Sequence, residues 1–505
     1  MDTKALRQKI LDLAIRGKLV PQDPNDEPAS VLLERIRVEK QQMVKEGKLK
    51  PKDIKNDTII FVGEDNLHYE KFQDGTVKCI ENEIPFEVPE GWAWCRLKHV
   101  CTMAAGKAKP TDQIMTEPFE GCYPCFGGNG IRGYVDEYNQ DGIFSIVGRQ
   151  GALCGNINIA KGKFYATEHA VVTTLFSGID FNWSNYVLEA LQLNSYATGA
   201  AQPGLSVANV LNVFVPVPPT QEQVHIGIRI AESIKIIENI EDEKENLQTL
   251  ISSAKSKILD LAIRGKLVSQ NPNDEPASVL LERIRAEKEE LIKQGKIKRD
   301  KKESIIFKGE DNSYYLKTGD ITEPLEDWEL DGLPDSWSFC CLGEICDYGN
   351  CINVATVDID DSAWILDLED IEKDTGIVLQ KVRKAKRNSI STKHLFHKGQ
   401  VLYSKLRPYL NKVVLADEDG YCTSEILPLD FQENIIPQYA RYYLMSPTFL
   451  QYTNKCSYGV KMPRLGTVDG KKTIITLPPL AEQKRIVKAI ETIFAQLDEI
   501  SNAIA

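Results

Sequence analysis

The chain has 505 residues, of which 42% are apolar and 27% charged, and its formal net charge at pH 7 is −12. This length predicts more than one domain, and the composition excludes collagen-like, disordered and membrane-spanning classes. No stretch approaches the roughly 18 consecutive apolar residues of a membrane helix, and the N-terminus lacks the apolar region of a signal peptide, so we expect a cytoplasmic protein without membrane contact. The acidic charge disfavours an isolated, tight binder of nucleic acid, although a local basic surface or a partner would offset it.

The chain begins with a helical segment that occurs twice. Residues 9–40, KILDLAIRGKLVPQDPNDEPASVLLERIRVEK, differ from residues 257–288 at three of 32 positions. In each copy the proline of the NDEPAS motif is placed to open a helix, and a glycine, Gly47 or Gly295, is placed to end it. The repeat therefore predicts two copies of one helical frame.

Two dissimilar stretches come after the two copies of this frame. IIFVGEDN from Ile59 matches IIFKGEDN from Ile305, but the stretches at roughly 91–217 and 336–477 show little resemblance to each other. Both stretches are dense in short β-branched or aromatic runs broken by Gly, Asn and Pro, which indicates mixed α/β structure with many strands. Random sequence change after a duplication would alter the helical frame as much as the stretches between its copies. Because the frame is nearly identical and the stretches are not, we interpret the stretches as two different specificities mounted on one frame.

A long helix is predicted after each Pro-Pro pair. PPTQEQ from Pro218 matches PPLAEQ from Pro478. After the first pair, apolar residues recur mostly at spacings of three or four until Gly265, which predicts roughly 44 residues of helix. The C-terminus and the first residues of the chain show the same apolar spacing, which places an apolar stripe along one face of a helix. We expect these helices to pack against one another in an antiparallel arrangement; the alternative is that each stripe packs on its neighbouring domain.

The two chain ends divide the second copy of the spacer between them. At the repeat offsets of 260 and 248 residues, residue 505 corresponds to position 245 of the first repeat and residue 1 to position 249. The organisation therefore predicts a pseudo-two-fold, pseudo-cyclic fold in which the termini meet.

Several motifs of the two stretches are specific in combination. In the first stretch they are GGNGIRGYVDEY from Gly127, IVGRQGALCGN from Ile146 and ATEHAVV from Ala166, and in the second VLYSKLRPYLNK from Val401 and TSEILPL from Thr423. Together with the Pro-Pro pairs followed by Glu-Gln, they resemble the specificity subunits of type I restriction-modification systems, in which such a pair leads into a conserved helix. The likeness extends over nearly the whole chain.

The resemblance implies a non-catalytic subunit that reads a two-part site in double-stranded DNA. It implies two methylation subunits and restriction subunits as partners, which supply S-adenosylmethionine, ATP and Mg²⁺, whereas this chain binds no cofactor. The expected fold class is α+β, with two mixed α/β target-recognition domains separated by a long antiparallel, coiled-coil-like helical spacer. The predicted segments are N-terminal helices (1–50), a connector (51–83), the first target-recognition domain (84–220), the central helical spacer (221–302), a connector (303–333), the second target-recognition domain (334–480) and the distal helix (481–505).

Base readout requires Arg or Lys for guanine and Asn or Gln for adenine, presented on loops. The candidate DNA-contacting residues are Asn129, Arg132, Arg149, Gln150 and Gln202 in the first domain and Lys381, Arg383, Lys405, Arg407, Asn411 and Lys412 in the second. The basic run KVRKAKR from Lys381 is a candidate phosphate track. Gln202-Pro203 aligns with Met462-Pro463, so a base contact by that glutamine does not carry over to both domains. For any one candidate, a salt bridge or a role in a turn is the alternative.

No catalytic or metal site is predicted. The chain lacks the Asn/Asp-Pro-Pro-aromatic loop of an adenine methyltransferase and the Gly-Lys-Ser/Thr loop that holds a triphosphate. Cys122 and Cys125 have zinc-ligand spacing but no second pair, and Glu168 beside His169 is interpreted as a structural pair. The remaining functional alternatives are a partner of an orphan methyltransferase or of a fused methylase-nuclease, and a coiled-coil adaptor that binds proteins.

Overall fold

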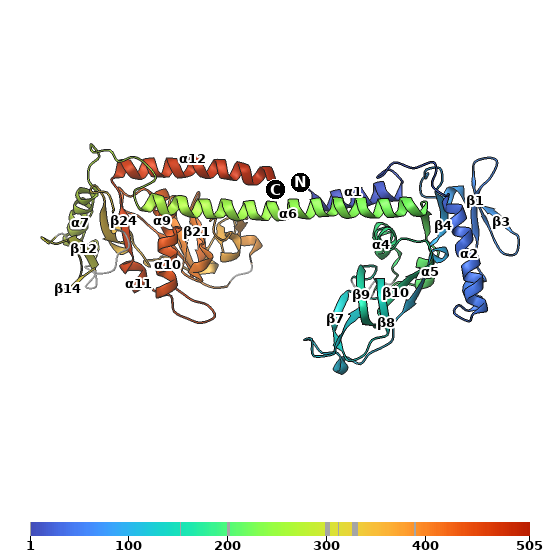
Figure 1. Ribbon diagram of the computed structural model, residues 1–505. Helices are drawn as coiled ribbons and strands as arrows, with labels where there is room; N and C mark the ends of the chain where they lie inside the picture. Colours follow the sequence, from blue (N-terminus) through green and yellow to red (C-terminus); the bar gives the residue numbers. More distant parts are fainter. Residues whose placement is uncertain are drawn as a thin grey trace. The chain divides into compact units, whose positions relative to one another are not determined.

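The computed structural model describes residues 2–151, 153–198, 203–297, 304–311, 313–325, 332–387 and 390–504. They form two compact units, Met1–Glu243 and Lys244–Ala505, each containing helices and β-sheets (Figure 1). The α+β class predicted from the sequence is confirmed. Among the described residues, no helix combines the length and the hydropathy that a membrane crossing requires. The finer segment boundaries and the meeting of the termini stay predictions.

The first unit carries the N-terminal helices, a small sheet and a larger sheet. Its helices are α1 (Thr3–Ile15), α2 (Ala29–Lys45), α3 (Pro51–Ile54), α4 (Phe181–Ala190), α5 (Val207–Leu211) and the first part of α6 (Thr220–Ile263). Its strands are β1 (Ile59–Val62), β2 (His68–Lys71), β3 (Val77–Cys79), β4 (Ala93–Arg96), β5 (Cys101–Ala105), β6 (Tyr123–Gly127), β7 (Gly130–Val135), β8 (Gln140–Gly148), β9 (Ile157–Ala166), β10 (Ala170–Leu175) and β11 (Phe214–Val217). The larger sheet has the order β5-β10-β8-β9-β6-β7, whereas β1-β2-β3 and β11-β4 pair separately.

The second unit repeats this plan with a different insert. Its helices are the last part of α6, α7 (Ala277–Lys293), α8 (Leu342–Ile345), α9 (Pro437–Leu444), α10 (Pro447–Cys456), α11 (Thr467–Lys472) and α12 (Leu480–Ile504). Its strands are β12 (Ser304–Lys308), β13 (Tyr314–Thr318), β14 (Ile321–Pro324), β15 (Ser338–Cys341), β16 (Asn353–Val354), β17 (Trp364–Leu366), β18 (Val382–Arg383), β19 (Lys393–Phe396), β20 (Val401–Ser404), β21 (Val413–Leu415), β22 (Gly420–Thr423), β23 (Ile426–Leu429) and β24 (Ile474–Leu477). They form sheets of order β12-β13-β14, β15-β24, β16-β19-β22-β17-β18 and β21-β20-β23.

The long helix α6 has 44 residues and is followed by Gly265 in the left-handed region (φ +67°), as the sequence predicts. In the first unit, α1 runs antiparallel to α6, because Arg7 pairs with Glu241 (3.3 Å) while Gln22, beyond the end of α1, meets Glu222 near the start of α6. α1 also packs on α4. Both arrangements considered for the apolar stripe, helix on helix and helix on domain, therefore occur in the first unit.

The second unit uses the same packing with α12. Lys255 of α6 pairs with Asp498 of α12, and Gln270, beyond the end of α6, reaches Glu482 at the start of α12 (2.6 Å). The apolar residues of α12 share one core with α9 and with Ile263 at the end of α6. The antiparallel pairing of the spacer helices predicted from the sequence is thus present in each unit taken by itself.

The Glu-Gln of each Pro-Pro motif connects the helical frame to its β-rich domain. In the first unit Glu222 accepts hydrogen bonds from the Trp92 indole (2.9 Å) and from the Gln22 amide (3.1 Å). Gln223 donates to the Pro218 carbonyl (3.0 Å) and accepts from the N–H of Asp180 (2.8 Å). Asp180 is the N-cap residue of α4.

The second unit repeats these bonds. Glu482 accepts from the Trp337 indole (3.1 Å) and from the Gln270 amide (2.6 Å). Gln483 donates to the Pro478 carbonyl (3.1 Å) and accepts from the Ile436 N–H (2.9 Å) at the start of α9. The motif therefore positions each domain on its frame.

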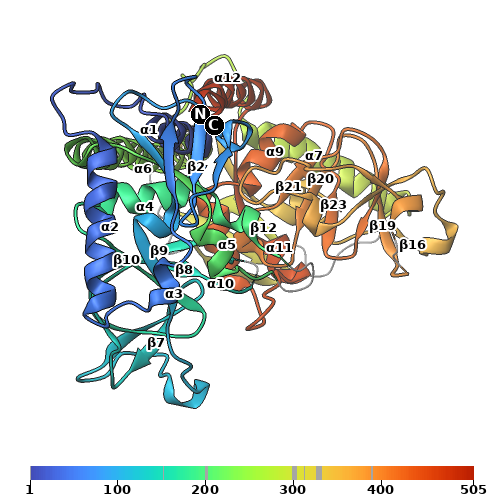
Figure 2. The same ribbon diagram turned by 90° about the vertical axis from the view of Figure 1, so that its right-hand side faces the viewer.

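A common three-stranded core lies inside the two inserts. In the first unit β8 pairs with β10 and β9, with Val147 opposite Val171 and Ile157. In the second unit β20 pairs with β23 and β21, with Tyr403 opposite Leu427 and Val413. Every one of these positions is displaced by 256 residues from its counterpart, so strand order and register are the same. Helix α9 covers β20 and β21 in the second unit (Figure 2).

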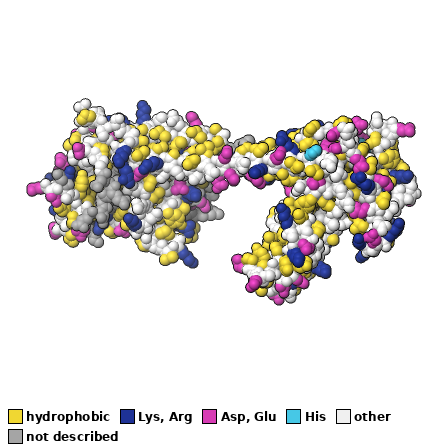
Figure 3. Space-filling model, viewed as in Figure 1, with side chains coloured by type: hydrophobic (Ala, Val, Ile, Leu, Met, Phe, Trp, Pro, Cys, Tyr) yellow, Lys and Arg dark blue, Asp and Glu magenta, His cyan; other side chains and the backbone are white. Residues whose placement is uncertain are grey.

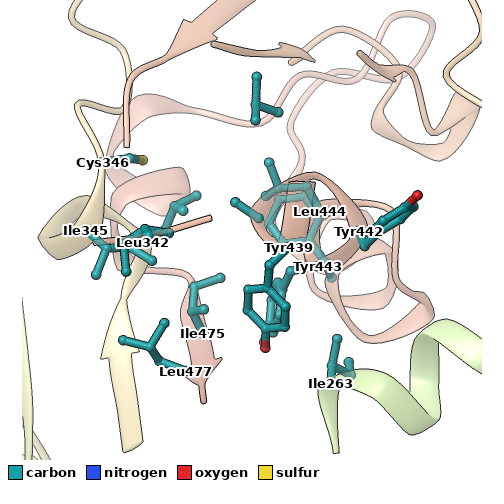
Figure 4. Close-up of a cluster of buried hydrophobic side chains, with 14 of the residues drawn as sticks. Ile263, Leu342, Ile345, Cys346, Tyr439, Tyr442, Tyr443, Leu444, Ile475 and Leu477 are labelled. Atoms are coloured by element: carbon teal, nitrogen blue, oxygen red, sulfur yellow. The ribbon is translucent and has the colours of Figure 1, made fainter. Parts of the chain in front are cut away.

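The apolar core of the second unit joins this insert to the frame. Tyr439, Tyr443 and Leu444 of α9 pack against Ile475 and Leu477 of β24 and against Leu342 and Ile345 of α8 (Figure 4). The buried hydroxyls of Tyr439 and Tyr443 donate to the carbonyls of Thr476 (2.8 Å) and Ile474 (3.0 Å). Burial thus leaves neither hydroxyl without a partner.

Candidate functional site

In the first domain, the candidate site is built around residues 149–151, the strand-end segment directly after β8. The Arg149 N–H donates to the His169 carbonyl (2.9 Å), and the Arg149 carbonyl accepts from the Leu205 N–H (2.9 Å). On the other side, Gly151 donates to the Pro203 carbonyl (3.0 Å). The backbone is therefore held from both sides, while the side chains of Arg149 and Gln150 are exposed.

The β6–β7 turn lies against this segment and brings two further candidates to it. A Cβ on Gly148 would lie 2.0 Å from the carbonyl oxygen of Gly128, so only glycine permits the approach. Asn129 at the tip of the turn is exposed and accepts from the Asn156 amide (2.7 Å). Arg132 is exposed on β7 and donates to the Thr111 hydroxyl (2.8 Å). Asn129, Arg132, Arg149 and Gln150 thus share one end of the sheet.

The second domain has an equivalent strand-end segment at residues 405–407, after β20. The Lys405 N–H donates to the Glu425 carbonyl (3.0 Å), and the Lys405 carbonyl accepts from the Leu465 N–H (3.0 Å). Arg407 donates its N–H to the Pro463 carbonyl (2.7 Å). These are the same backbone hydrogen bonds that hold residues 149–151, although the two sequences share no visible motif. Among the described residues, the side chains of Lys405 and Arg407 have no hydrogen-bond or ion-pair partner.

Asn411 and Lys412 bond to backbone carbonyls of their own domain, so the structure does not favour them as base contacts, and their selection stays a prediction. Asn411 is 7% exposed, adopts a left-handed conformation (φ 49°), and donates from its amide to the Met445 carbonyl (3.2 Å). The Lys412 ammonium donates to the Leu368 carbonyl (2.7 Å), and burial lowers the pKa of this amine. Both side chains thus make hydrogen bonds within the domain, whereas the alternatives considered from the sequence were a salt bridge or a role in a turn.

The basic run from Lys381 is largely neutralised by neighbouring carboxylates. Lys381 pairs with Asp417 (2.7 Å) and Arg383 with Glu418 (2.8 Å), and both cations lie on the surface. Burial disfavours the charge on Arg387, but hydrogen bonds to Asp370 and Asp367 outweigh it and raise the pKa of this guanidinium. The run therefore offers less free positive charge to a phosphate track than its composition indicates. On the face drawn in Figure 3, Lys and Arg are interspersed with Asp and Glu.

Sequence reasoning missed one part of this region, the loop of residues 458–464 after α10. Tyr458 and Arg464 exchange backbone hydrogen bonds (3.1 and 2.9 Å), as Thr198 and Gly204 do in the first domain (3.0 and 2.9 Å). The alternation of Tyr458, Val460 and Met462 is the pattern of a half-buried strand, and only Gly459 and Pro463 in this segment signal a loop. Gln202, the candidate on the matching loop, lies outside the described residues.

Glu168 and His169 form a polar pair near the first site. The His169 ring nitrogen and the Glu168 carboxylate lie 3.4 Å apart, and both side chains are 39% exposed. Within the described ranges, no group of three or more His, Cys, Asp or Glu is placed to hold a metal ion. In each domain, loops present hydrogen-bonding and cationic side chains, and backbone hydrogen bonds hold these loops in place.

Comparisons with known proteins point to one family. The model of the type I restriction modification DNA specificity domain matches residues 89–249 and 334–505. The type I restriction enzyme EcoEI specificity subunit of Escherichia coli is 26% identical over 99% of this chain and 90% of its own length. The EcoprrI specificity subunit of E. coli is 46% identical over 26% of this chain and 33% of its own. The crystal structure of the HsdS subunit from Thermoanaerobacter tengcongensis aligns with 83% of this chain and 93% of its own, at 16% identity and a TM-score of 0.38.

Proposed function

The chain belongs to the family of type I restriction-modification DNA specificity subunits, and we propose that each of its two target-recognition domains reads one half of a bipartite DNA site. As a specificity subunit it is not itself a catalyst. The observation that carries the proposal is the strand-end segment, which has the same backbone hydrogen bonds in both domains and different side chains. A common frame that presents different polar groups suits two half-sites of different sequence.

In the first domain, we assign base readout to Arg149 and Gln150, with Asn129 and Arg132 beside them. A guanidinium pairs with the O6 and N7 atoms of guanine, and an amide pairs with the N6 and N7 groups of adenine. The side chains of Arg149 and Gln150 have no partner among the described residues, so DNA does not have to displace one. Gly128 and Gly148 support this assignment because their close approach brings the β6–β7 turn with Asn129 beside Arg149 and Gln150.

In the second domain, we assign readout to Lys405 and Arg407. Both lie after β20 at the place that Arg149 and Gly151 take after β8. Lys381 and Arg383 stay candidates for phosphate contacts only, because a phosphate would have to replace their present carboxylate partners. Asn411 and Lys412 are left out of the assignment.

We further propose that the chain recruits two methylation subunits and, in the complete enzyme, restriction subunits. The support is the duplication: two frames with the same Trp-Glu-Gln contacts suit two copies of one partner. S-adenosylmethionine, ATP and Mg²⁺ would bind those partners and not this chain. The complex would act in the cytoplasm, where its DNA substrate lies.

The test is an exchange of domains followed by mapping of methylated adenines. Residues 91–217 are replaced by the corresponding segment of a relative with a different site, and the chimera is co-expressed with its methylation subunit. We expect one half of the recognised sequence to change and the other half to remain. The unaltered chain without that subunit should leave DNA unmethylated. A change in both halves would overturn the two-reader proposal.

A further inference from the structure

The 458–464 loop presents apolar side chains to solvent. Tyr458 is 62% exposed, Met462 49%, and Val460 fully exposed at 102%. Lys461, also exposed, stands between them. In Figure 1 the loop after α10 projects from the body of its unit. Single exposed apolar residues are ordinary on protein surfaces, but three of them on one short loop beside the proposed readers indicate a contact surface.

The base of this loop is firmly held. The Arg464 guanidinium donates to both oxygens of Glu425 at 2.9 to 3.2 Å. Leu465 and Pro463 bond to the backbone of Lys405 and Arg407. The apolar tip therefore stands on an ordered base, next to two cations whose side chains have no partner within the described ranges. The ordered base reduces the conformational freedom that the loop loses on binding.

The occupant that fits this surface is duplex DNA, since Lys461 on the loop complements a phosphate backbone and the neighbouring Lys405 and Arg407 are the proposed base readers. Valine and methionine gain nothing from phosphates or from the nitrogen and oxygen atoms of base edges. The apolar group that a base pair presents in the major groove is the C5-methyl of thymine. The chemistry of the tip therefore selects this methyl group.

We propose that the 458–464 loop enters the major groove of the half-site read by the second domain and recognises a thymine through contact of Val460 and Met462 with its methyl group. This inference rests on the proposed function and adds the base and the residues that read it. In the sequence, the position equivalent to Met462 is occupied by Gln202, whose amide suits adenine instead. The inferred thymine therefore belongs to one half-site only.

The experiment removes the methyl group and the side chain separately. The chain is purified with its methylation subunit, its site is mapped, and each thymine of both half-sites is replaced singly by deoxyuridine, which lacks only the methyl. One replacement should weaken binding by about fourfold, the effect of one buried methyl-sized group. The Val460→Ala complex should bind the unmodified site more weakly and lose its sensitivity to that replacement. Val357→Ala, at a valine of the same unit that is 87% exposed, is the matched control and should keep the wild-type response.

The outcomes separate the two levels of the proposal. A wild-type complex without any specific bipartite site would overturn the proposed function itself. A specific complex that responds to no deoxyuridine, or a Val460→Ala complex that keeps the full response, would overturn the assignment of the loop alone. Equal weakening of the thymine and uracil duplexes by Val460→Ala is one form of that full response, because Val460 would then contribute without contacting the methyl group.

Discussion

At the scale of single residues, the buried carboxylates Glu222 and Glu482 hold each domain to its frame. Each accepts one indole and one amide hydrogen bond and is at most 2% exposed. Burial raises the pKa of both groups above the ordinary 4.5, and the hydrogen bonds offset only part of that effect. An indole hydrogen bond to such a group is costly to remove, since a buried charge without its donor is unfavourable.

Trp92→Phe should therefore destabilise the protein more than Trp94→Phe does. Both tryptophans are buried, but the Trp94 indole nitrogen has no partner among the described residues. The two substitutions remove similar volume, so the difference isolates the bond to Glu222. We expect a difference of about 1–3 kcal/mol in the free energy of unfolding, measured by urea denaturation followed by circular dichroism. Coincident unfolding curves would show that the bond contributes nothing.

The raised pKa values of Glu222 and Glu482 also predict a pH dependence. Because the folded protein holds these protons more tightly than the unfolded chain, the stabilisation is complete below about pH 4.5 and is lost as the pH rises through the folded-state pKa. The double variant Glu222→Gln, Glu482→Gln does not ionise at these positions. Its stability should fall less than that of the wild type between about pH 4.5 and pH 7. Parallel pH profiles of the two proteins would contradict the assignment.

At the scale of elements, the three-stranded core shows where the two domains agree and where they diverge. β8 and β20 occupy the same register, yet the last residue of β8 is Gly148 and that of β20 is Ser404. The glycine makes room for the β6–β7 turn, whereas the serine hydroxyl donates to the Leu406 carbonyl (2.9 Å). The residue at this strand end thus differs between the domains, and in the first domain it is the glycine that admits the β6–β7 turn.

Gly148→Ala should impair recognition of the first half-site alone. Its Cβ would meet the backbone of Gly128 at 2.0 Å and displace the turn that carries Asn129, at a cost of about 1–3 kcal/mol. Gly204→Ala is the matched control, because the nearest atom to its Cβ would lie at 3.9 Å. Methylation of duplexes with single base changes in each half-site measures the effect. Equal loss of recognition in both half-sites would argue against separate readers.

At the scale of the whole molecule, α6 contributes residues to both units without a break over its 44 residues. A continuous helix rises about 1.5 Å per residue, so its length can serve as a ruler. Four residues inserted after Leu247 would add about 6 Å and rotate the downstream residues by only about 40° beyond a full turn. The hypothesis from the sequence, that this helix sets the distance between the half-sites, is thereby open to a direct test.

The insertion should lengthen the unread spacer of the DNA site by one or two base pairs, at about 3.4 Å per base pair, and leave both half-sites unchanged. Methylome sequencing of cells that carry the variant with its methylation subunit measures the spacer. Substituting four helix-compatible residues at the same place without an insertion is the control. An active variant with the original spacer would mean that the helix does not set the distance, and altered half-site bases would mean that it does more.

The sequence by itself determined the duplicated frame, the family and the extent of α6, because helix periodicity, capping residues and repeats are local signals. It did not reveal that the inserts share a core. Their common register depends on hydrogen bonds between strands, which residues of quite different sequence make equally well.

Only the tertiary structure decided which candidate side chains are free. Lys381 meets Asp417, which lies 36 residues further along the chain, and Asn411 is buried against Met445, 34 residues away. Lys405 and Arg407, from the same motif as Asn411, stay without partners among the described residues. The type of a residue determines whether its side chain is able to bind DNA. Packing between distant segments determines whether that side chain is buried or already paired, and therefore whether it is available to DNA.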